Sequence, residues 1–138
     1  MTSSSTGRCL CGAVTFTATP RGGMHACHCG TCRRLSGGIL FSVDCGDSVV
    51  VQGAVATYAS SDWATRQFCP ACGTSLFWRS NDGAVTMVSA QAFDDPSAFV
   101  LEDEFCIESK PDTYALAGDR PRLTTCLLYT SPSPRDKR

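Results

Sequence analysis

Two short cysteine pairs constrain the fold of this chain more than any other feature. One has the spacing C-x-C and the other C-x-x-C, and a glycine follows each pair directly: Cys9, Cys11 and Gly12, then Cys69, Cys72 and Gly73. Such pairs from distant parts of a chain typically supply the four thiolates of a closed structural zinc site, and glycine suits the tight turn beside the metal. The sequence therefore predicts a zinc site that joins two distant segments and adds folding energy to a small core. Two redox-active pairs, or loose core cysteines, are the alternative.

A third group of cysteines, in the stretch CHCGTCRRLSGG, has three members: Cys27, Cys29 and Cys32. Three protein ligands with no obvious fourth are typical of a catalytic zinc, which keeps one position for water or substrate. Three thiolates make the metal a poor Lewis acid toward water, and their softness favours sulfur chemistry. We therefore expect a second zinc here, whose fourth ligand is a substrate thiol held as a thiolate.

The competing interpretation is that another side chain of the same chain closes this second site. Cys45, His25 and His28 are the candidates. His28 lies between two ligands, so its side chain should point away from the metal, toward solvent, the groups around the site or a substrate. A lone cysteine is usually a small buried apolar residue. This interpretation, a buried core residue, applies to Cys45 and also to Cys106, which lies in the last expected strand.

Two arginines, Arg33 and Arg34, follow the third cysteine of this group directly. They could pair with a substrate carboxylate through two hydrogen bonds each, and with His28 they are the candidate substrate-binding residues. The alternative is that both lie on the solvated face of a short helix. The same alternative applies to Arg66 and Arg79.

Composition and charge limit the partners of the chain. It has 138 residues, 43% of them hydrophobic, which suffices for one domain with a modest core. The net charge of −1 gives no electrostatic case for nucleic acid or an anionic membrane, and no apolar run approaches the roughly 20 residues of a membrane helix. The N-terminus, MTSSSTGR, lacks the features of a secretory signal. We therefore expect a cytoplasmic protein, in which ten cysteines indicate metal rather than disulfides.

Short alternating segments between turn residues predict a mainly β fold built around metal, with few helical turns. Strands are expected over 13–19, 39–43, 48–52, 54–59, 66–68, 75–79, 84–89 and 104–108, and short helices over 31–36 and 96–99. Residues 1–6 are expected to be disordered and 7–125 to form one zinc-binding domain. Residues 126–138 change abruptly to a Ser/Pro/basic composition. We interpret them as a non-native tail that resembles translated adapter DNA, and we give Cys126 no role; a natural flexible tail is the alternative.

Several segments together resemble the glutathione-dependent formaldehyde-activating enzyme family, which includes the centromere protein V-like proteins: GRCLCGAVTF, CHCGTCRRLSG, RQFCPACGTSLFWRS, DDPSAF and ESKPDTYAL. The resemblance runs from about Gly7 to Leu123 and implies a β-tent fold of coiled antiparallel sheets. It also implies two zinc sites, a structural one on Cys9, Cys11, Cys69 and Cys72 and a catalytic one on Cys27, Cys29 and Cys32, near which glutathione binds. Thr113 departs from the pattern, because the family usually has tryptophan there.

The resemblance implies a carbon–sulfur lyase whose reaction, in reverse, condenses glutathione with formaldehyde to S-(hydroxymethyl)glutathione. The expected function is thus a zinc-dependent enzyme acting on an adduct of glutathione, or another thiol, with an aldehyde. It would carry two Zn²⁺ ions per chain, use glutathione as co-substrate and have small thiols and aldehydes as partners. A non-catalytic zinc-binding module for protein interaction or thiol carriage is the alternative, and so is a purely structural second zinc. The sequence does not indicate the oligomeric state.

Overall fold

The structure is a computed structural model that describes residues 4–125, and its fold is mainly β, as the sequence predicts. The strands are β1 (Ser5–Arg8), β2 (Thr15–Ala18), β3 (Met24–Cys27), β4 (Leu40–Asp44), β5 (Val50–Gln52), β6 (Ala56–Ala59), β7 (Ala64–Phe68), β8 (Ser75–Ser80), β9 (Thr86–Ser89), β10 (Leu101–Phe105) and β11 (Arg122–Leu123). The helices are α1 (Gly30–Ser36) and the short 3₁₀ turns η1 (Ala90–Ala92), η2 (Pro96–Ala98) and η3 (Ile107–Ser109). Among the described residues, no helix has the length and apolar character needed to cross a membrane.

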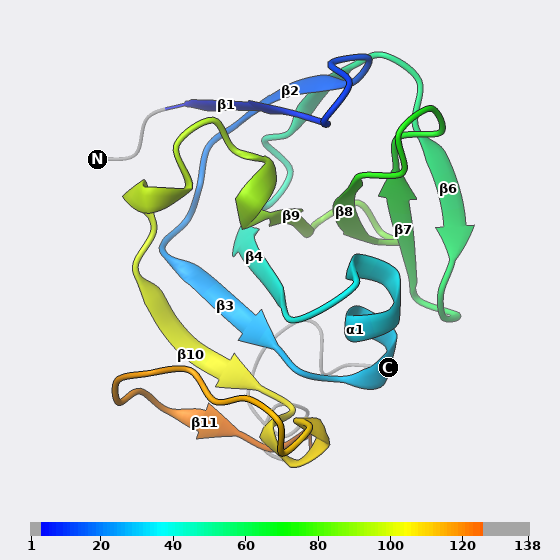
Figure 1. Ribbon diagram of the computed structural model, residues 1–138. Coiled ribbons are helices and arrows are strands. Elements are labelled where there is room, and N and C mark those ends of the chain that lie inside the picture. The colour runs from blue at the N-terminus through cyan, green and yellow to red at the C-terminus, as the bar shows by residue number, and fades with distance from the viewer. Residues whose placement is uncertain (1–3, 126–138) are drawn as a thin grey trace.

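Within the described residues the strands form two sheets, of three and eight strands. The small sheet has the order β1-β2-β5, and the large one the order β11-β10-β3-β4-β9-β8-β7-β6. In Figure 1 the large sheet curves from β11 at the lower left to β6 at the right, with β1 and β2 above it. All pairs are antiparallel except those of β10, which runs parallel to both β3 and β11. The parallel β10–β3 pair brings together two segments far apart in the chain.

The core lies where the two sheets meet. In β2 the buried Phe16 and Ala18 alternate with the exposed Thr17, which is the pattern of a half-buried strand. The Phe16 ring packs edge-on against Phe77 of β8 and against Phe93, with ring centroids 5.3 Å apart in both pairs. Aromatic packing of this kind therefore joins the small sheet to the large one.

Helix α1 follows β3 almost directly and is bounded by local sequence signals. Cys29 caps its start, since its Sγ accepts a hydrogen bond from the backbone nitrogen of Cys32 at 3.3 Å. Gly37 ends it with a φ of 76°, donating its N–H to the carbonyl of Arg33. The expected helix over 31–36 is therefore confirmed, and it carries the third cysteine of the CHCGTC stretch.

Some expectations about the elements were wrong. Ser5 and Thr6, expected to be disordered, begin β1, where Thr6 Oγ1 donates to Asp94 Oδ2 at 2.5 Å. The last expected strand, 104–108, ends at Phe105, because Cys106 turns the backbone into the left-handed region with a φ of 56°. Strands β3 and β11 were not expected. Residues 126–138, with Cys126, lie outside the described residues.

Candidate metal centres

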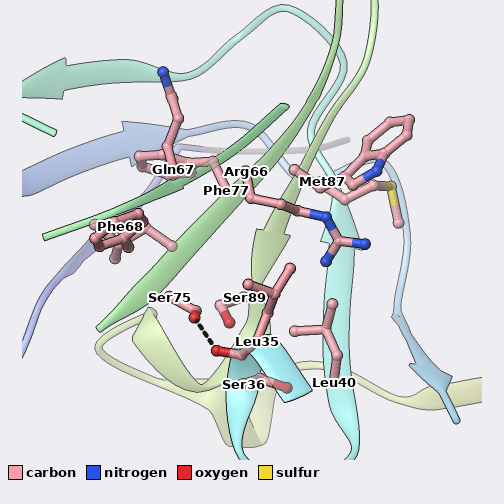
Figure 2. A pocket seen from close by; sticks show the side chains of 12 residues that line it. Leu35, Ser36, Leu40, Arg66, Gln67, Phe68, Ser75, Phe77, Met87 and Ser89 are labelled. Atoms are coloured by element: carbon pink, nitrogen blue, oxygen red, sulfur yellow. Dashed lines mark hydrogen bonds between the residues drawn. The ribbon is translucent and has the colours of Figure 1, made fainter. Parts of the chain in front are cut away.

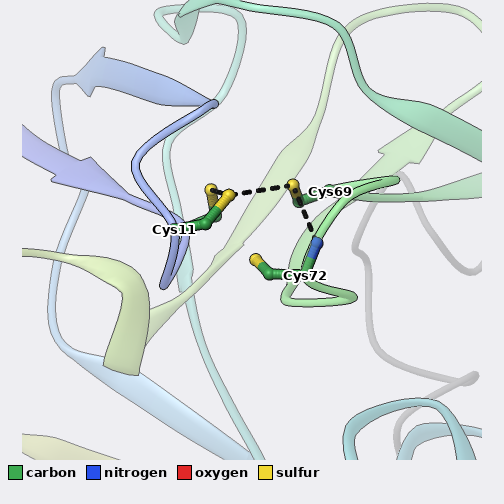
Figure 3. Close-up of side chains that lie close together, drawn as sticks. Cys11, Cys69 and Cys72 are labelled. Carbon is green, nitrogen blue, oxygen red and sulfur yellow. Dashed lines mark hydrogen bonds between the residues drawn. The ribbon is translucent and has the colours of Figure 1, made fainter.

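Four sulfur atoms from the ends of β1 and β7 converge in the first group: those of Cys9, Cys11, Cys69 and Cys72, all within 4.8 Å of one another. Sulfurs at the corners of a tetrahedron, each about 2.3 Å from a central zinc, lie about 3.8 Å apart. The Sγ atoms of Cys9 and Cys11 are 3.7 Å apart, and those of Cys11 and Cys69 are 3.8 Å apart. Figure 3 shows the two segments facing each other across this group. The donor set therefore fits a tetrahedral zinc site.

The two segments that supply these sulfurs have matching local geometry. In each, the backbone N–H of the first cysteine donates to the carbonyl five residues later at 3.0 Å, and the following glycine has a φ of 81°. Backbone nitrogens also approach the sulfurs: Val14 N lies 3.3 Å from Cys9 Sγ, and Cys72 N lies 3.4 Å from Cys69 Sγ. Hydrogen bonds to sulfur favour the thiolate, which is the form that binds metal.

Thr74 connects the two segments. Its Oγ1 accepts a hydrogen bond from the backbone of Leu10 at 3.1 Å and lies 3.1 Å from Cys72 Sγ. Hydrogen bonds from the side chain and backbone of Thr74 lower the pKa of Cys72 to about 5, so this residue is a thiolate at neutral pH. The local structure thus prepares the first group for a cation.

The second group lies at the junction of β3 and α1 and contains Cys27, Cys29 and Cys32, whose sulfurs are within 4.8 Å of one another. Cys32 is buried, and the other two are half-buried. Thiolates crowded in this way repel one another, so a cation must balance them before all can ionise. Three soft donors beside a cavity fit a zinc ion with one position open.

Two of the side chains considered as an internal fourth ligand lie outside this group. Cys45 is 1% exposed within the hydrophobic core, and burial raises the pKa of its thiol to about 12. The Nδ1 atom of His25 is 2.6 Å from Asp103 Oδ1, and the His25 ring stacks on Phe105. Neither residue is among the mutually close donors.

His28, the third candidate, points away from the thiols, as expected, and it faces neither solvent nor the cavity. It is completely buried, with Nε2 2.8 Å from Glu104 Oε1 and Nδ1 3.2 Å from the Tyr114 hydroxyl. Glu104 also pairs with Arg120 at 2.6 Å and Arg122 at 3.2 Å. Successive side chains of an extended segment point to opposite faces, so His28 turns away from the thiols on either side of it. This placement does not support the substrate-binding role considered for His28.

A fourth thiol, which the sequence analysis treated as an ordinary core cysteine, lies beside the second group. Cys106 follows Phe105, the β10 residue that pairs in parallel register with Cys27. Its side chain contacts those of Cys27 and Cys29 and lines the same cavity. Contact with Cys106 is the main cause that holds the pKa of Cys29 far below its usual range and raises that of Cys27 far above it. The pairing of β10 with β3 places Cys106 beside this group. No local sequence pattern around Cys106 therefore indicated that it lies at the second site.

The second group opens into a cavity of about 250 Å³. Besides the four thiols, its walls include Trp63, Arg66, Trp78, Met87 and Phe105. The two indole rings meet edge-on, with centroids 6.4 Å apart. A cavity whose walls combine soft metal donors with aromatic residues has the character of a small-molecule site.

Arg66 reaches this cavity from β7. Its Nη2 lies 3.6 Å from Cys32 Sγ, and its Nε is buried with no hydrogen-bond partner among residues 4–125. Figure 2 shows the guanidinium beside Met87 and above Leu35 and Leu40, which line a smaller adjoining hollow of about 40 Å³. Arg66 thus places a positive charge at the thiols with hydrogen-bonding capacity still available.

Arg33 and Arg34, the arginines chosen from the sequence, do not line the cavity. Arg33 is half-buried and its Nε donates to the carbonyl of His28 at 3.0 Å, whereas Arg34 is exposed. Residues one and two positions after Cys32 lie on other faces of the helix. The arginine at the site therefore comes from a distant strand rather than from the helix itself.

Comparison with known proteins decides the family. The family model described as glutathione-dependent formaldehyde-activating enzyme matches residues 4–109, which include both thiol groups and Cys106. The chain belongs to the glutathione-dependent formaldehyde-activating enzyme family. The resemblance seen in the sequence is thereby confirmed.

Two relatives agree with membership in the glutathione-dependent formaldehyde-activating enzyme family. A protein of Schizosaccharomyces pombe (strain 972 / ATCC 24843), named as an uncharacterized lyase, is 32% identical over 124 residues, covering 86% of this chain and 89% of that protein. The crystal structure of a Rhodobacter sphaeroides protein aligns with a TM-score of 0.57 at 22% identity, covering 64% of this chain and 87% of that chain. At that identity, the second likeness shows the fold alone.

Proposed function

We propose that this protein is a zinc-dependent carbon–sulfur lyase that acts on the adduct of a thiol, such as glutathione, with a small aldehyde, in the manner of S-(hydroxymethyl)glutathione synthase. Family membership and a relative named as a lyase support a lyase-type enzyme. The observation that carries the finer proposal is the group of three thiols opening into a cavity next to an arginine.

Cys27, Cys29 and Cys32 hold the metal in this proposal, and the cavity gives a substrate access to its open position. Zinc bound there would generate a thiolate from the substrate thiol at neutral pH and orient it. In synthesis, the substrate sulfur forms a bond to the carbonyl carbon, and the carbonyl oxygen takes up a proton. In the lyase direction, the hydroxyl loses its proton, the carbon–sulfur bond breaks and the thiolate leaves.

Arg66 has two roles in this proposal. Its guanidinium lies beside Cys32 and partly balances the negative charge of the thiolates. Its side chain lines the cavity and its Nε makes no hydrogen bond to the described residues, which supports pairing of the guanidinium with a substrate carboxylate. Glutathione carries carboxylates as well as a thiol, which fits a site with both features.

One observation favours the alternative, a non-catalytic zinc module. Cys106 is close enough to Cys27 and Cys29 to contact them, and a metal with four protein thiolates is a closed structural site. The two functions therefore differ in whether an external thiol can reach the metal.

Exchange spectroscopy of ¹³C-formaldehyde with glutathione tests the proposal, because the adduct also forms spontaneously and only an increased exchange rate reports catalysis. We expect the zinc-loaded protein to accelerate exchange between free aldehyde and adduct, and the folded Cys27→Ser variant to lose this effect. Metal analysis on the same samples should give two zinc ions per chain for the wild type and one for the variant. Equal exchange rates with wild type, variant and buffer would overturn the lyase proposal.

A further inference from the structure

Cys106 lies against the second thiol group because two strands distant in sequence are paired in parallel. β10 pairs with β3 so that Phe105 is opposite Cys27, and the backbone nitrogen of His28 donates to the carbonyl of Phe105 at 3.1 Å. The residue after Phe105 is therefore held beside the segment that carries Cys27 and Cys29. Cys106 is 5% exposed, lines the same cavity as Cys27 and Cys29, and its thiol interacts with both of theirs.

The backbone at Cys106 has a conformation that non-glycine residues rarely adopt. Its φ is 56° and its ψ is 47°, and within residues 4–125 no other non-glycine residue has a positive φ. This left-handed conformation brings Cβ close to the following carbonyl and is strained for a side chain. Such outliers persist where the surrounding structure enforces them, often at functional sites. Here the strained residue is the one that presents a thiol to the second group.

Cys106 is close to the group without being a full member of it. The set of donors within 4.8 Å of one another contains Cys27, Cys29 and Cys32 but not Cys106. The Cys106 thiol interacts with those of Cys27 and Cys29. Cys106 is therefore a thiol beside the three donors, placed to supply a fourth ligand but not fixed in their set.

We infer that Cys106 is an exchangeable fourth ligand of the second metal: its thiolate occupies the open position when no substrate is bound, and an entering substrate thiol displaces it. This inference rests on the proposed function, since it concerns the position that the substrate would take. It explains how a chain with four thiols at this site can still accept an external one.

The exchange is balanced without any change of oxidation state. With a metal bound, the Cys106 thiolate would leave the fourth position as the substrate thiolate takes it. The released Cys106 sulfur takes the proton that the entering thiol gives up, so the number of thiolates on the metal is the same before and after. Thr125 contacts Cys106 and also lines the cavity, so the displaced thiol has a polar neighbour.

Cys45 provides a matched comparison for this inference. It is also a buried single cysteine, at 1% exposure, but it packs within the hydrophobic core and belongs to neither thiol group. Its backbone φ is not positive. Removing Cys45 therefore controls for the loss of a buried thiol in general.

The test uses the full chain loaded with cobalt(II) or zinc under nitrogen. Three variants are compared with the wild type: Cys106→Gly, which suits the positive φ, Cys106→Ser, which keeps the shape, and Cys45→Ala. X-ray absorption of the zinc forms should give about four sulfurs per metal for the wild type and Cys45→Ala, and a mean of about three and a half for both Cys106 variants. Sulfur-to-cobalt charge-transfer absorption should fall in the Cys106 variants alone.

Titration with glutathione then tests the exchange. In Cys106→Gly the missing sulfur should be restored by glutathione, and binding should tighten by about tenfold or more, because no internal thiolate competes for the position. In the wild type, glutathione should bind with little change in charge-transfer intensity, since one sulfur replaces another.

The outcomes separate this inference from the proposed function. Identical spectra for Cys106→Gly and the wild type overturn the inference, even if the wild type accelerates adduct exchange. Fewer sulfurs in the variant, with no glutathione binding to the wild type, make Cys106 a permanent ligand and overturn the exchange. Glutathione binding as expected, without accelerated adduct exchange, supports the inference and overturns the lyase proposal alone.

Discussion

The imidazole of His28 donates from Nε2 to Oε1 of Glu104 at 2.8 Å, and both side chains are at most 1% exposed. Burial alone would raise the pKa of Glu104, but the hydrogen bond from His28 and the pairing with Arg120 and Arg122 outweigh it and lower the pKa. The residue between Cys27 and Cys29 is thus fixed by a buried ionic network on the side away from the cavity.

Breaking this network should destabilise the protein strongly. In Glu104→Gln the buried His28 and the partly buried Arg120 lose their anion, which we expect to cost about 3 kcal/mol in the free energy of unfolding. Asp103→Asn is the matched control, because Asp103 precedes Glu104 directly and also pairs with a histidine, His25, but both of these side chains are about a fifth exposed. We expect a loss of about 1 kcal/mol or less. Urea unfolding of the zinc-loaded proteins measures both, and equal losses would contradict the importance of the buried network.

Gly53 should be intolerant of any side chain. Its φ is 102°, and a Cβ there would lie 2.2 Å from the carbonyl oxygen of Ala13, which is backbone of the first metal-binding segment. We expect Gly53→Ala to cost about 3 kcal/mol through the combined backbone strain and clash. Gly37 also has a positive φ, 76°, but a Cβ there would have no other atom within 4 Å. Gly37→Ala should therefore cost only about 1 kcal/mol. Thermal unfolding distinguishes the two, and a Gly53→Ala variant as stable as Gly37→Ala would refute the clash.

Arg66 should determine affinity for thiols that carry a carboxylate. For Arg66→Gln we expect KM for glutathione to rise roughly tenfold to hundredfold, as for loss of a charge-assisted hydrogen bond. The reaction of 2-mercaptoethanol, which has no carboxylate, should be weakened less, because only the positive charge beside Cys32 is lost. Arg34→Gln, at an exposed helix position, serves as the control and should behave as wild type. The assignment fails if Arg66→Gln affects both thiols equally.

The two thiol groups should differ in their contribution to folding. Cys9→Ser removes a ligand of the first group, which joins distant segments, and we expect it to unfold the domain or lower its melting temperature strongly. Cys27→Ser should stay folded with one zinc ion fewer. Circular dichroism and metal analysis of both variants decide this, and unfolding of Cys27→Ser to the same extent would make the second site structural.

Local signals were sufficient to predict several elements from the sequence. The start of α1 at the cysteine stretch and its end at Gly37 follow from capping and glycine geometry, and Asn81-Asp82-Gly83 marks the turn between β8 and β9. The spacing of the cysteine pairs was enough to predict the first group, because each pair carries its own turn geometry.

The remaining features depend on non-local pairing, which the sequence does not encode in any one segment. β3, with the residues MHAC, has no alternating pattern and forms because β4 and β10 flank it. The same pairing brings Cys106 to the second group. Arg66 reaches the site from β7, whereas Arg33 and Arg34 were chosen only for their proximity in the chain to Cys32. Proximity in sequence is thus a poor guide to this cavity.

The convergence of the first thiol group also affects the unfolded state. Cys11 and Cys69 are 58 positions apart, and a cross-link that closes a loop of this length removes unfolded-chain entropy worth about 4 kcal/mol at 25 °C. Every strand from β2 to β7 lies inside that loop. A metal bound by the first group would therefore restrict the denatured chain as a disulfide does, without requiring oxidation. Loss of this metal would remove the restriction from about half of the strands at once.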